Sequence, residues 1–169
     1  MRTRDFLEQK PQGTRIALHS GMQDFPHHYA VTASGSPGGD VALSSAGLPV
    51  LLSAPPTEFG GPGDRWSPET MLVAAIGDCF ILTFRAVARA SKLPWESLAC
   101  DVVGALDRVD RVTQFTGFQV HATLTVAPGA DVDQAHKALE RAEHACLVTN
   151  SLKAAVQLET KVLIAAGVS

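Results

Sequence analysis

The chain has 169 residues, of which 46% are hydrophobic and 18% are charged, and its formal net charge is −3. A chain of this length fits a single domain with a substantial hydrophobic core, and its composition excludes extensive disorder. Because the chain is slightly acidic and has no long basic run, we do not expect nucleic acid or an anionic membrane surface to be its main partner.

The N-terminal residues lack the continuous apolar stretch of a signal peptide. The most apolar segment, residues 71–84, is interrupted by Asp78 and followed by Arg85 and Arg89, so we expect it to be too short and too charged to cross a membrane. Three cysteines do not provide the framework of a disulfide-rich secreted protein. We therefore expect a cytoplasmic protein whose cysteines are catalytic, redox-sensing or simply buried.

The first part of the chain divides into an arm and a set of short strands. Residues 1–26 have mixed charge and no sustained period, and we interpret them as an N-terminal arm before a single domain at 27–169. Alternating apolar and polar residues, interrupted by turn-forming residues, predict strands at 29–34, 41–45 and 48–53. The next segment, 54–66, is so rich in Gly and Pro that we expect no regular structure there.

The clearest helix start in the chain follows this loop. Ser67 can cap the first turn, Pro68 suits the first helical position and Glu69 complements the positive end of the helix dipole. The helix is expected to run to about Ser91, because Pro94 stops it. Its first half is apolar on nearly every face, which is typical of a central helix buried on all sides.

The C-terminal half of the chain combines strands with a second helix. We predict strands at 100–106, 118–126 and 156–164, with a connecting turn at 107–111. Asp131 begins a helix with one apolar face, and Gln134 stands where a capping box has its second residue. Strands, a long helix, further strands, a helix and a final strand together predict an α+β domain.

Cys79 and Cys146 lie in surroundings that suggest chemistry. Cys79 follows a charged residue, Asp78, inside an apolar helix, and such a charge is costly unless it reaches solvent, a partner or a site. Cys146 lies between a helix and a polar turn, where a following short helix would make its thiol easier to ionise. Alternatively, both are packing residues, as buried free cysteines usually are. Cys100 lies in a predicted strand without a polar cluster, and we interpret it as structural.

A metal site is a further alternative, formed by His144 and Cys146 with His27 and His28. A structural metal site needs four ligands at recognisable spacing, and these residues do not provide it. We therefore predict no metal site and no cofactor.

Two segments of the chain resemble a known family. Residues 67–80, SPETMLVAAIGDCF, resemble the first-cysteine helix of the OsmC/Ohr family, the osmotically inducible and organic-hydroperoxide-resistance proteins. Residues 146–153, CLVTNSLK, resemble that family's second-cysteine segment, and the whole resemblance covers about residues 28–165. It implies an OsmC-like α+β fold, with antiparallel sheets packed around a long buried central helix, and an intertwined homodimer with two sites at the subunit interface.

The resemblance also implies a reaction. Cys79 would attack an organic hydroperoxide and become a sulfenic acid, Cys146 would resolve it as a disulfide, and a dithiol such as a lipoyl group would reduce the pair. Glu69 would be the helix glutamate that supports the family's catalytic arginine. Glu69 and Cys79 are about 15 Å apart along one helix, so they would meet only where two such helices cross antiparallel in a dimer.

The sequence departs from the family at the position of the catalytic arginine. The hairpin turn at 35–40 contains none, and Glu58-Phe59 stand about where an Arg-Phe pair would be. The nearest cation is Arg65, which would pair with Glu69, reach the site from a shifted position, or remain a solvated loop charge.

Phe59 and Trp66 flank the Gly-rich loop and are expected to wall an apolar entrance for an organic substrate, together with Phe80 and Asp78 beside Cys79. They would otherwise be ordinary core or interface residues. The sequence therefore leaves open a thiol-dependent hydroperoxide reductase, a redox-responsive or small-molecule-binding module without turnover, and a structural protein whose cysteines only pack.

Overall fold

The computed structural model describes residues 24–166. By its internal contacts the chain divides into two units, Met1–Val31 and Thr32–Ser169. Residues 24–31, the described part of the first unit, contain no helix or strand. The predicted arm at 1–26 falls largely outside the described residues, so the boundary between it and a domain at 27–169 stays a prediction.

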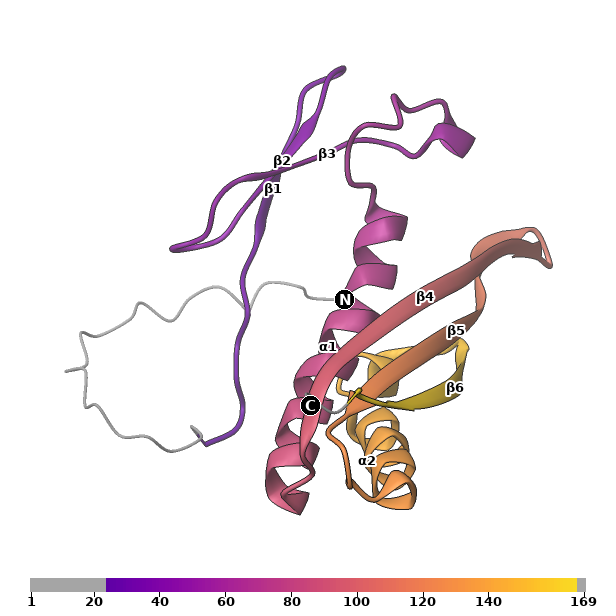
Figure 1. The fold of residues 1–169 in the computed structure, drawn as a ribbon. Helices are drawn as coiled ribbons and strands as arrows, with labels where there is room; N and C mark the ends of the chain where they lie inside the picture. The colour runs from indigo at the N-terminus through magenta and orange to yellow at the C-terminus, as the bar shows by residue number, and fades with distance from the viewer. Residues whose placement is uncertain (1–23, 167–169) are drawn as a thin grey trace. The chain divides into compact units, whose positions relative to one another are not determined.

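Three short strands form the first sheet of the second unit: β1 (Thr32–Ser34), β2 (Val41–Ser44) and β3 (Leu51–Ser53). They pair antiparallel in chain order. Figure 1 labels all three strands. The three predicted strands are therefore confirmed, although each is shorter than expected. Nearly all their residues are exposed or half-buried, so this sheet buries little apolar surface within its own chain.

The second sheet is built on a long hairpin. β4 (Trp95–Val109) pairs antiparallel with β5 (Val112–Val126), and both strands extend well beyond their predicted ranges. The turn between them consists only of Asp110 and Arg111, whose φ angles of 49° and 67° are those of a tight two-residue hairpin turn. The predicted turn at 107–111 was therefore too long.

β6 (Ala155–Ile164) corrects the expectation of purely antiparallel sheets. It pairs with β5 in parallel, so the second sheet is mixed, with the order β4-β5-β6. Parallel neighbours need a long crossover connection, and the segment that contains α2 (Val132–Ala145) provides it between β5 and β6. The alternation at 156–164 identifies a strand but not its direction, because a period of two is common to both pairings.

α1 (Pro68–Ser91) begins and ends where the sequence predicts. The Ser67 hydroxyl accepts a hydrogen bond from the Thr70 amide at 3.2 Å, and the Thr70 hydroxyl accepts one from the Ser67 amide at 2.9 Å. These reciprocal bonds make a capping box, which satisfies two of the free amides at the helix start. At the other end, Lys92 takes a left-handed φ of 53° and stops the helix before Pro94.

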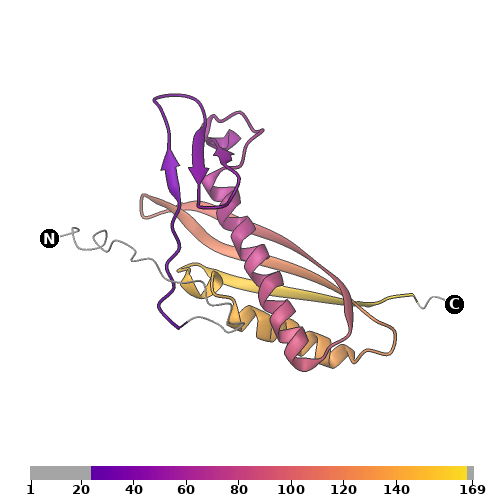
Figure 2. The same ribbon diagram turned by 90° about the vertical axis from the view of Figure 1, so that its left-hand side faces the viewer.

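The expectation that α1 is buried on nearly every face is wrong for the single chain. Ile76, Phe80 and Phe84 are at most 2% exposed. Their side of the helix packs against the β4–β5–β6 sheet and α2 (Figure 2). Away from this face Leu82 is 51% exposed, and only 28% of the most apolar stretch of the helix is buried. Residues 71–84 therefore carry more apolar surface than one chain covers.

α1 also corrects the expectation that this segment is too short and too charged to cross a membrane. Its 24 residues are long enough and apolar enough to do so, by length and composition alone. Phe80 and Phe84, however, belong to the hydrophobic core of the chain. A core helix of a soluble protein meets the same criteria of length and composition, so these criteria carry no argument for a membrane span.

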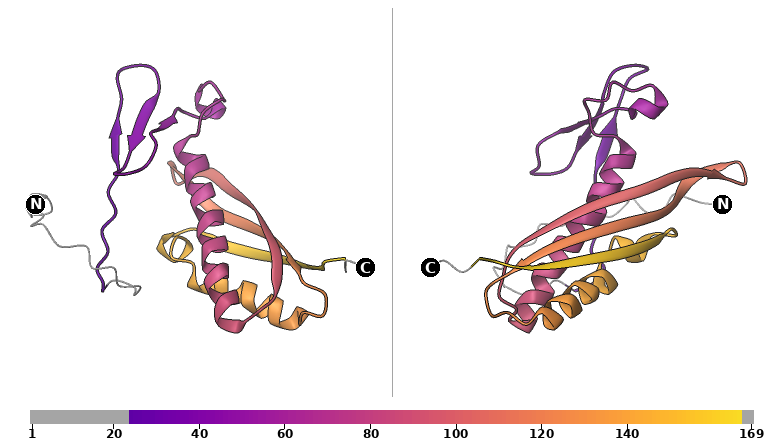
Figure 3. Two further views of the ribbon diagram at one scale, coloured as in Figure 1. Left: turned by 60° about the vertical axis from the view of Figure 1, so that its left-hand side comes forward. Right: turned by 45° about the vertical axis from the view of Figure 1, so that its right-hand side comes forward.

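Asp131 caps α2, as predicted, by accepting a hydrogen bond from the Gln134 amide at 3.1 Å. Gln134 does not complete the predicted capping box, because its side-chain amide donates to the carbonyl of Ser91 at 2.8 Å. This bond satisfies a free carbonyl in the last turn of α1 and ties the start of α2 to the end of α1 (Figure 3).

The core lies between the two helices and one face of the β4–β5–β6 sheet (Figure 3). The largest buried apolar side chains come from α1, α2 and β5, and they include Ile76, Phe80, Phe84, Val120, Leu124, Val126 and Leu139. Phe84 also contacts Trp95 edge to face, with 5.2 Å between the ring centroids. This packing fixes α1 and α2 side by side, and the candidate site lies between them.

Candidate functional site

The structure brings the thiols of Cys79 and Cys146 together. Cys79 lies in the middle of α1, and Cys146 is the residue that ends α2. Each of the two side chains acts on the pKa of the other, so the two thiols are neighbours in the fold. Cys146 is fully buried, Cys79 is partly buried, and both are free thiols. Two residues far apart in the chain therefore form one shielded dithiol site.

The segment after Cys146 turns back toward α1. The amide of Asn150 and the hydroxyl of Thr149 each donate to the Cys146 carbonyl at 3.1 Å. These bonds close a tight turn that contains the short 3-10 helix η2 (Thr149–Ser151). A further bond, from the Asn150 side chain to the His144 carbonyl at 3.0 Å, fastens this turn to the end of α2. Residues 147 and 148 are thereby held next to the dithiol.

Three neutral donors surround the sulfur of Cys79. The backbone amides of Leu147 and Val148, in the turn after Cys146, act on it as donors and lower its pKa. The hydroxyl oxygen of Thr83, one turn further along α1, lies 4.0 Å from the sulfur. All three would donate to a thiolate at this position, which stabilises its negative charge.

The surroundings shift the pKa values of the two thiols in opposite directions. Burial raises the pKa of Cys79, but the amides, the hydroxyl and the Cys146 thiol outweigh this effect, and the pKa lies below its ordinary value. Burial raises the pKa of Cys146, and hydrogen bonds from Thr149 do not compensate for it. The expectation that a short helix after Cys146 makes its thiol easier to ionise is therefore wrong. The amides that follow it lower the pKa of Cys79 instead.

Cys100 differs from both. It lies on β4, and burial raises its pKa to about 11, with smaller effects from the charge of Asp101 and from Cys146. A thiol with such a pKa is almost entirely protonated at neutral pH and reacts slowly as a nucleophile. These properties agree with the interpretation of Cys100 as a structural residue.

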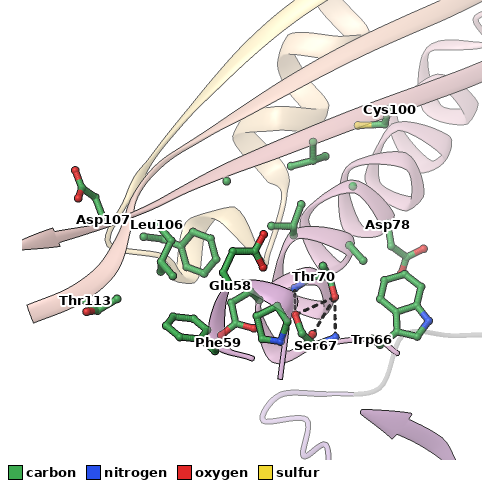
Figure 4. Close-up of a pocket in the computed structure, with 18 of the residues that line it drawn as sticks. Glu58, Phe59, Trp66, Ser67, Thr70, Asp78, Cys100, Leu106, Asp107 and Thr113 are labelled. Carbon is green, nitrogen blue, oxygen red and sulfur yellow. Dashed lines mark hydrogen bonds between the residues drawn. The ribbon is translucent and has the colours of Figure 1, made fainter. Parts of the chain in front are cut away.

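A cavity of about 910 Å³ opens between the start of α1, β4 and the loop before α1. Phe59 and Trp66, which were predicted to wall an apolar entrance, both line it and are 58% and 49% exposed. Asp78 lines it as well, and Figure 4 shows Cys100 and Asp107 toward opposite ends of its strand-side wall. The loop is more regular than predicted, because it contains the short 3-10 helix η1 (Thr57–Phe59).

The cavity and the dithiol lie on different faces of α1. Seven residues of α1 line the cavity, and they recur along one side of the helix: Glu69, Thr70, Val73, Ala74, Gly77, Asp78 and Ile81. At about 100° per residue, Cys79 lies about 200° around the helix from Gly77. Cys79 and Cys146 are accordingly not among the residues that line this cavity. Phe80, which was expected at the substrate pocket, is 2% exposed and is a core residue in this structure.

Arg65 pairs with aspartates rather than with Glu69. Its Nε lies 2.9 Å from Asp40 Oδ2, and its Nη1 lies 3.1 Å from Asp64 Oδ2. Among the three alternatives for Arg65, the structure favours an exposed charge on the loop. This charge is paired with two aspartates. Glu69 lies at the cavity wall, and its Oε2 is shielded from solvent without a hydrogen-bond partner among the described residues.

Within residues 24–166, no group of three or more His, Cys, Asp or Glu side chains is arranged to hold a metal ion. His144 is exposed and its Nδ1 lies 3.4 Å from a carboxylate oxygen of Glu143, whereas Cys146 is buried. These two residues therefore face different surroundings.

Comparison with known proteins assigns the chain to a family. A family model described as OsmC-like protein matches residues 61–161, which is more than half of the chain and includes both Cys79 and Cys146. The chain belongs to the OsmC-like family. The uncharacterized protein YmaD of Bacillus subtilis (strain 168) is similar to it, with 28% identity over 147 residues that cover 83% of this chain and 97% of YmaD.

Solved structures of OsmC-like proteins share the fold. An organic hydroperoxide resistance protein OsmC from Legionella pneumophila aligns with a TM-score of 0.63 and 26% identity, over 80% of this chain and 97% of that chain. The organic hydroperoxide resistance protein OhrB of Bacillus subtilis aligns with a TM-score of 0.60 and 19% identity, over 78% and 96%. An OsmC-like protein from Mycoplasma pneumoniae aligns with a TM-score of 0.69 and 15% identity, over 84% and 100%. The OsmC-like α+β fold is thereby confirmed.

Sequence reasoning missed the groups that surround Cys79 in this family member. Thr83 lies four residues after Cys79, and this spacing puts two helical residues on the same face, so it could have been found. The amides of Leu147 and Val148 carry no signal in the sequence, because any residue except proline has a backbone amide.

Proposed function

We propose that this OsmC-like protein reduces organic hydroperoxides with the Cys79–Cys146 pair. The observation that carries the proposal is that two free thiols from distant parts of the chain lie next to each other, with Cys146 fully buried and Cys79 partly accessible. The lowered pKa of Cys79 supports its role as the attacking thiol. A peroxidatic thiol must be a thiolate to attack, while a resolving thiol only needs to lie nearby. Organic hydroperoxide resistance proteins from Legionella pneumophila and Bacillus subtilis share the fold, which supports the same assignment.

In the proposed reaction, the Cys79 thiolate attacks an oxygen of the hydroperoxide ROOH. A sulfur–oxygen bond forms while the oxygen–oxygen bond breaks, the alkoxide leaves and takes up a proton to become an alcohol, and Cys79 becomes a sulfenic acid. Cys146 then attacks the sulfenic sulfur, which forms the disulfide and releases water. An external dithiol, of the lipoyl type, reduces the disulfide to two thiols and is itself oxidised to a cyclic disulfide.

We also propose that the working molecule is an intertwined homodimer. The β1–β3 sheet buries little apolar surface in its own chain, and α1 leaves Leu82 exposed. A second copy would cover both surfaces, and the free energy gained would grow with the apolar area buried. If two α1 helices cross antiparallel, the cavity and Glu69 of one copy come toward Cys79 of the other, which supplies a substrate pocket for the dithiol.

The oligomeric state is open to a direct measurement. Size-exclusion chromatography with light scattering should give twice the chain mass of 17.8 kDa at micromolar concentration. A strict monomer with full activity would contradict the shared site. The proposed location is the cytoplasm, since a reducing compartment would keep both thiols reduced between turnovers.

Peroxide consumption by variants tests the proposed reaction. We expect the wild type, with a dithiol donor, to consume cumene hydroperoxide far faster than free cysteine does. Cys79→Ser should abolish this activity, and Cys146→Ser should leave a sulfenic acid on Cys79 that dimedone traps. Cys100→Ser is the matched control and should behave as the wild type, because the pKa of about 11 keeps Cys100 protonated. Full activity in Cys79→Ser would overturn the proposal.

A second candidate is a redox-responsive dithiol protein without efficient turnover. The groups that lower the pKa of Cys79 are all neutral, and Arg65 is engaged by Asp40 and Asp64. Without a cation to bind the leaving oxygen, catalysis loses electrostatic stabilisation of the transition state. This candidate predicts a reversible disulfide between Cys79 and Cys146 that forms no faster than free cysteine reacts.

A further inference from the structure

A basic hollow lies where α1 ends and the chain turns into β4 (Figure 1). Its volume of about 410 Å³ is enough for a small organic molecule. Three cations and four apolar residues line it: Arg85, Arg89, Lys92, Ala88, Leu93, Pro94 and Trp95. None of these lining residues is acidic, and Glu96, next to Trp95 in the chain, is not one of them. The hollow shares no lining residue with the cavity at the start of α1.

The three cations form one stripe of α1 and its C-terminal cap. Positions 85, 89 and 92 are separated by four and three residues, so their side chains are neighbours on the helix surface. All three are exposed, and none of them forms an ion pair within residues 24–166. Like charges at this spacing repel one another, so an anion between them would relieve the repulsion.

The carbonyl groups at the end of α1 are engaged in hydrogen bonds. The Ser91 hydroxyl donates to the carbonyls of Val87 and Ala88 at 2.9 and 3.3 Å. The Leu93 amide also donates to the Ala88 carbonyl at 3.0 Å, and the Gln134 side chain donates to the Ser91 carbonyl at 2.8 Å. Free carbonyls at a helix C-terminus repel anions, and these bonds reduce that repulsion beside the hollow.

The floor of the hollow is apolar. Ala88 and Leu93 are buried, and the half-buried ring of Trp95 is held edge to face against Phe84. Guanidinium groups bind carboxylates through two parallel hydrogen bonds, whereas an aromatic ring offers an apolar surface. Cations above an apolar floor therefore complement a molecule that combines a carboxylate with an apolar body.

We infer that the basic hollow binds an organic carboxylate, with its charged group at Arg85 and Arg89 and its apolar body against Trp95. The inference goes beyond the peroxide chemistry and does not rest on it, because neither cysteine of the dithiol lines the hollow. A protein that proves to have no peroxidase activity would still be expected to bind such an anion.

Three probes that differ in the head group test the inference: 4-phenylbutyrate, 4-phenylbutanol and 4-phenylbutylamine. The titrations use Trp66→Phe, in which Trp95 is the remaining tryptophan of the chain and reports binding by its fluorescence. One exposed ion pair raises affinity only a few-fold, so three cations together should favour the carboxylate over the alcohol about tenfold. The amine should bind most weakly. At about 1 M salt, where charges are screened within about 3 Å, the preference should disappear.

Variants identify the groups responsible. Arg85→Gln combined with Arg89→Gln should abolish the tenfold preference, while the affinity for the alcohol stays the same. Both side chains are exposed, so the fold should be kept, which an unchanged unfolding midpoint in urea checks. Lys153→Gln combined with Lys161→Gln removes two exposed cations outside the hollow, is the matched control and should change nothing.

Two outcomes would overturn the inference. Equal affinity for the carboxylate and the alcohol, or a preference that survives the double substitution, would mean that the cations do not select an anion. Failure of 4-phenylbutyrate to change the fluorescence of Trp95 at millimolar concentration would mean that the hollow is not a ligand site, as when a second copy covers it. Adding Cys79→Ser should leave the binding unchanged, which separates these results from any failure of the peroxide reaction.

Discussion

Replacing Thr83 with valine isolates one of the three donors around Cys79. Valine has nearly the shape of threonine, so the exchange removes the hydroxyl without opening a cavity. A hydrogen bond of ordinary strength is worth about 1 kcal/mol, and this one is long, with 4.0 Å between Thr83 Oγ1 and Cys79 Sγ. We therefore expect a loss of about 0.7 kcal/mol, which raises the pKa of Cys79 by about half a unit. At pH values well below this pKa, the thiolate fraction then falls about threefold.

The assay is the rate of alkylation of Cys79 by iodoacetamide as a function of pH, followed by peptide mass so that each cysteine is counted separately. The midpoint of the rate profile gives the pKa of Cys79 in the wild type and in Thr83→Val. Thr116→Val removes an exposed hydroxyl that bonds to the Ala105 carbonyl, far along the chain from the dithiol, and serves as the control. An unchanged or lowered pKa in Thr83→Val would refute the idea that neutral donors set the acidity of Cys79.

Three further outcomes are expected. Given its pKa of about 11, about one Cys100 thiol in a thousand is ionised at pH 8. Iodoacetamide should therefore label Cys79 long before Cys100. The reverse order of labelling, measured by peptide mass, would contradict the argument that burial keeps Cys100 protonated. Arg65→Ala removes exposed ion pairs with Asp40 and Asp64, should change the free energy of unfolding in urea only slightly, and should leave the pKa of Cys79 unchanged. A raised pKa would instead mean that Arg65 reaches the dithiol of a partner copy. Phe80→Ala should lower the free energy of unfolding by about 3–5 kcal/mol in the same assay, because Phe80 is a core residue. A loss below about 1 kcal/mol would mean that Phe80 is not a core residue and is again a candidate for the substrate pocket.

The start of α1 can be predicted from the sequence because local chemistry determines it. Features that depend on contacts between distant parts of the chain cannot be predicted in this way. Ser67 and Pro68 determine the helix start through hydrogen bonds and backbone angles within four residues, so the sequence locates it correctly. The direction of β6 depends on the α2 crossover, and the burial of α1 depends on which elements pack against it. The spacing of apolar residues shows only which faces of a segment are apolar, so it predicts neither the direction of a strand nor the burial of a helix.

The candidate site shows the same division. Cys79 and Cys146 were identified because two local segments resemble a family, and the fold does bring the two thiols together. The pairing of Arg65 with Asp40 joins residues 25 positions apart, so the sequence left three alternatives open for that arginine. The donors that lower the pKa of Cys79 are mostly backbone amides, whose positions follow from the turn after Cys146 and not from residue types.

The pairing of Cys79 with Cys146 is open to one decisive measurement. Reduced protein is treated with one equivalent of cumene hydroperoxide, blocked with an alkylating agent and digested, and its disulfides are mapped by peptide mass. We expect a single bond between Cys79 and Cys146 of the same chain, with Cys100 alkylated. A disulfide that includes Cys100, or two thiols that remain reduced while the peroxide is consumed, would contradict the dithiol site.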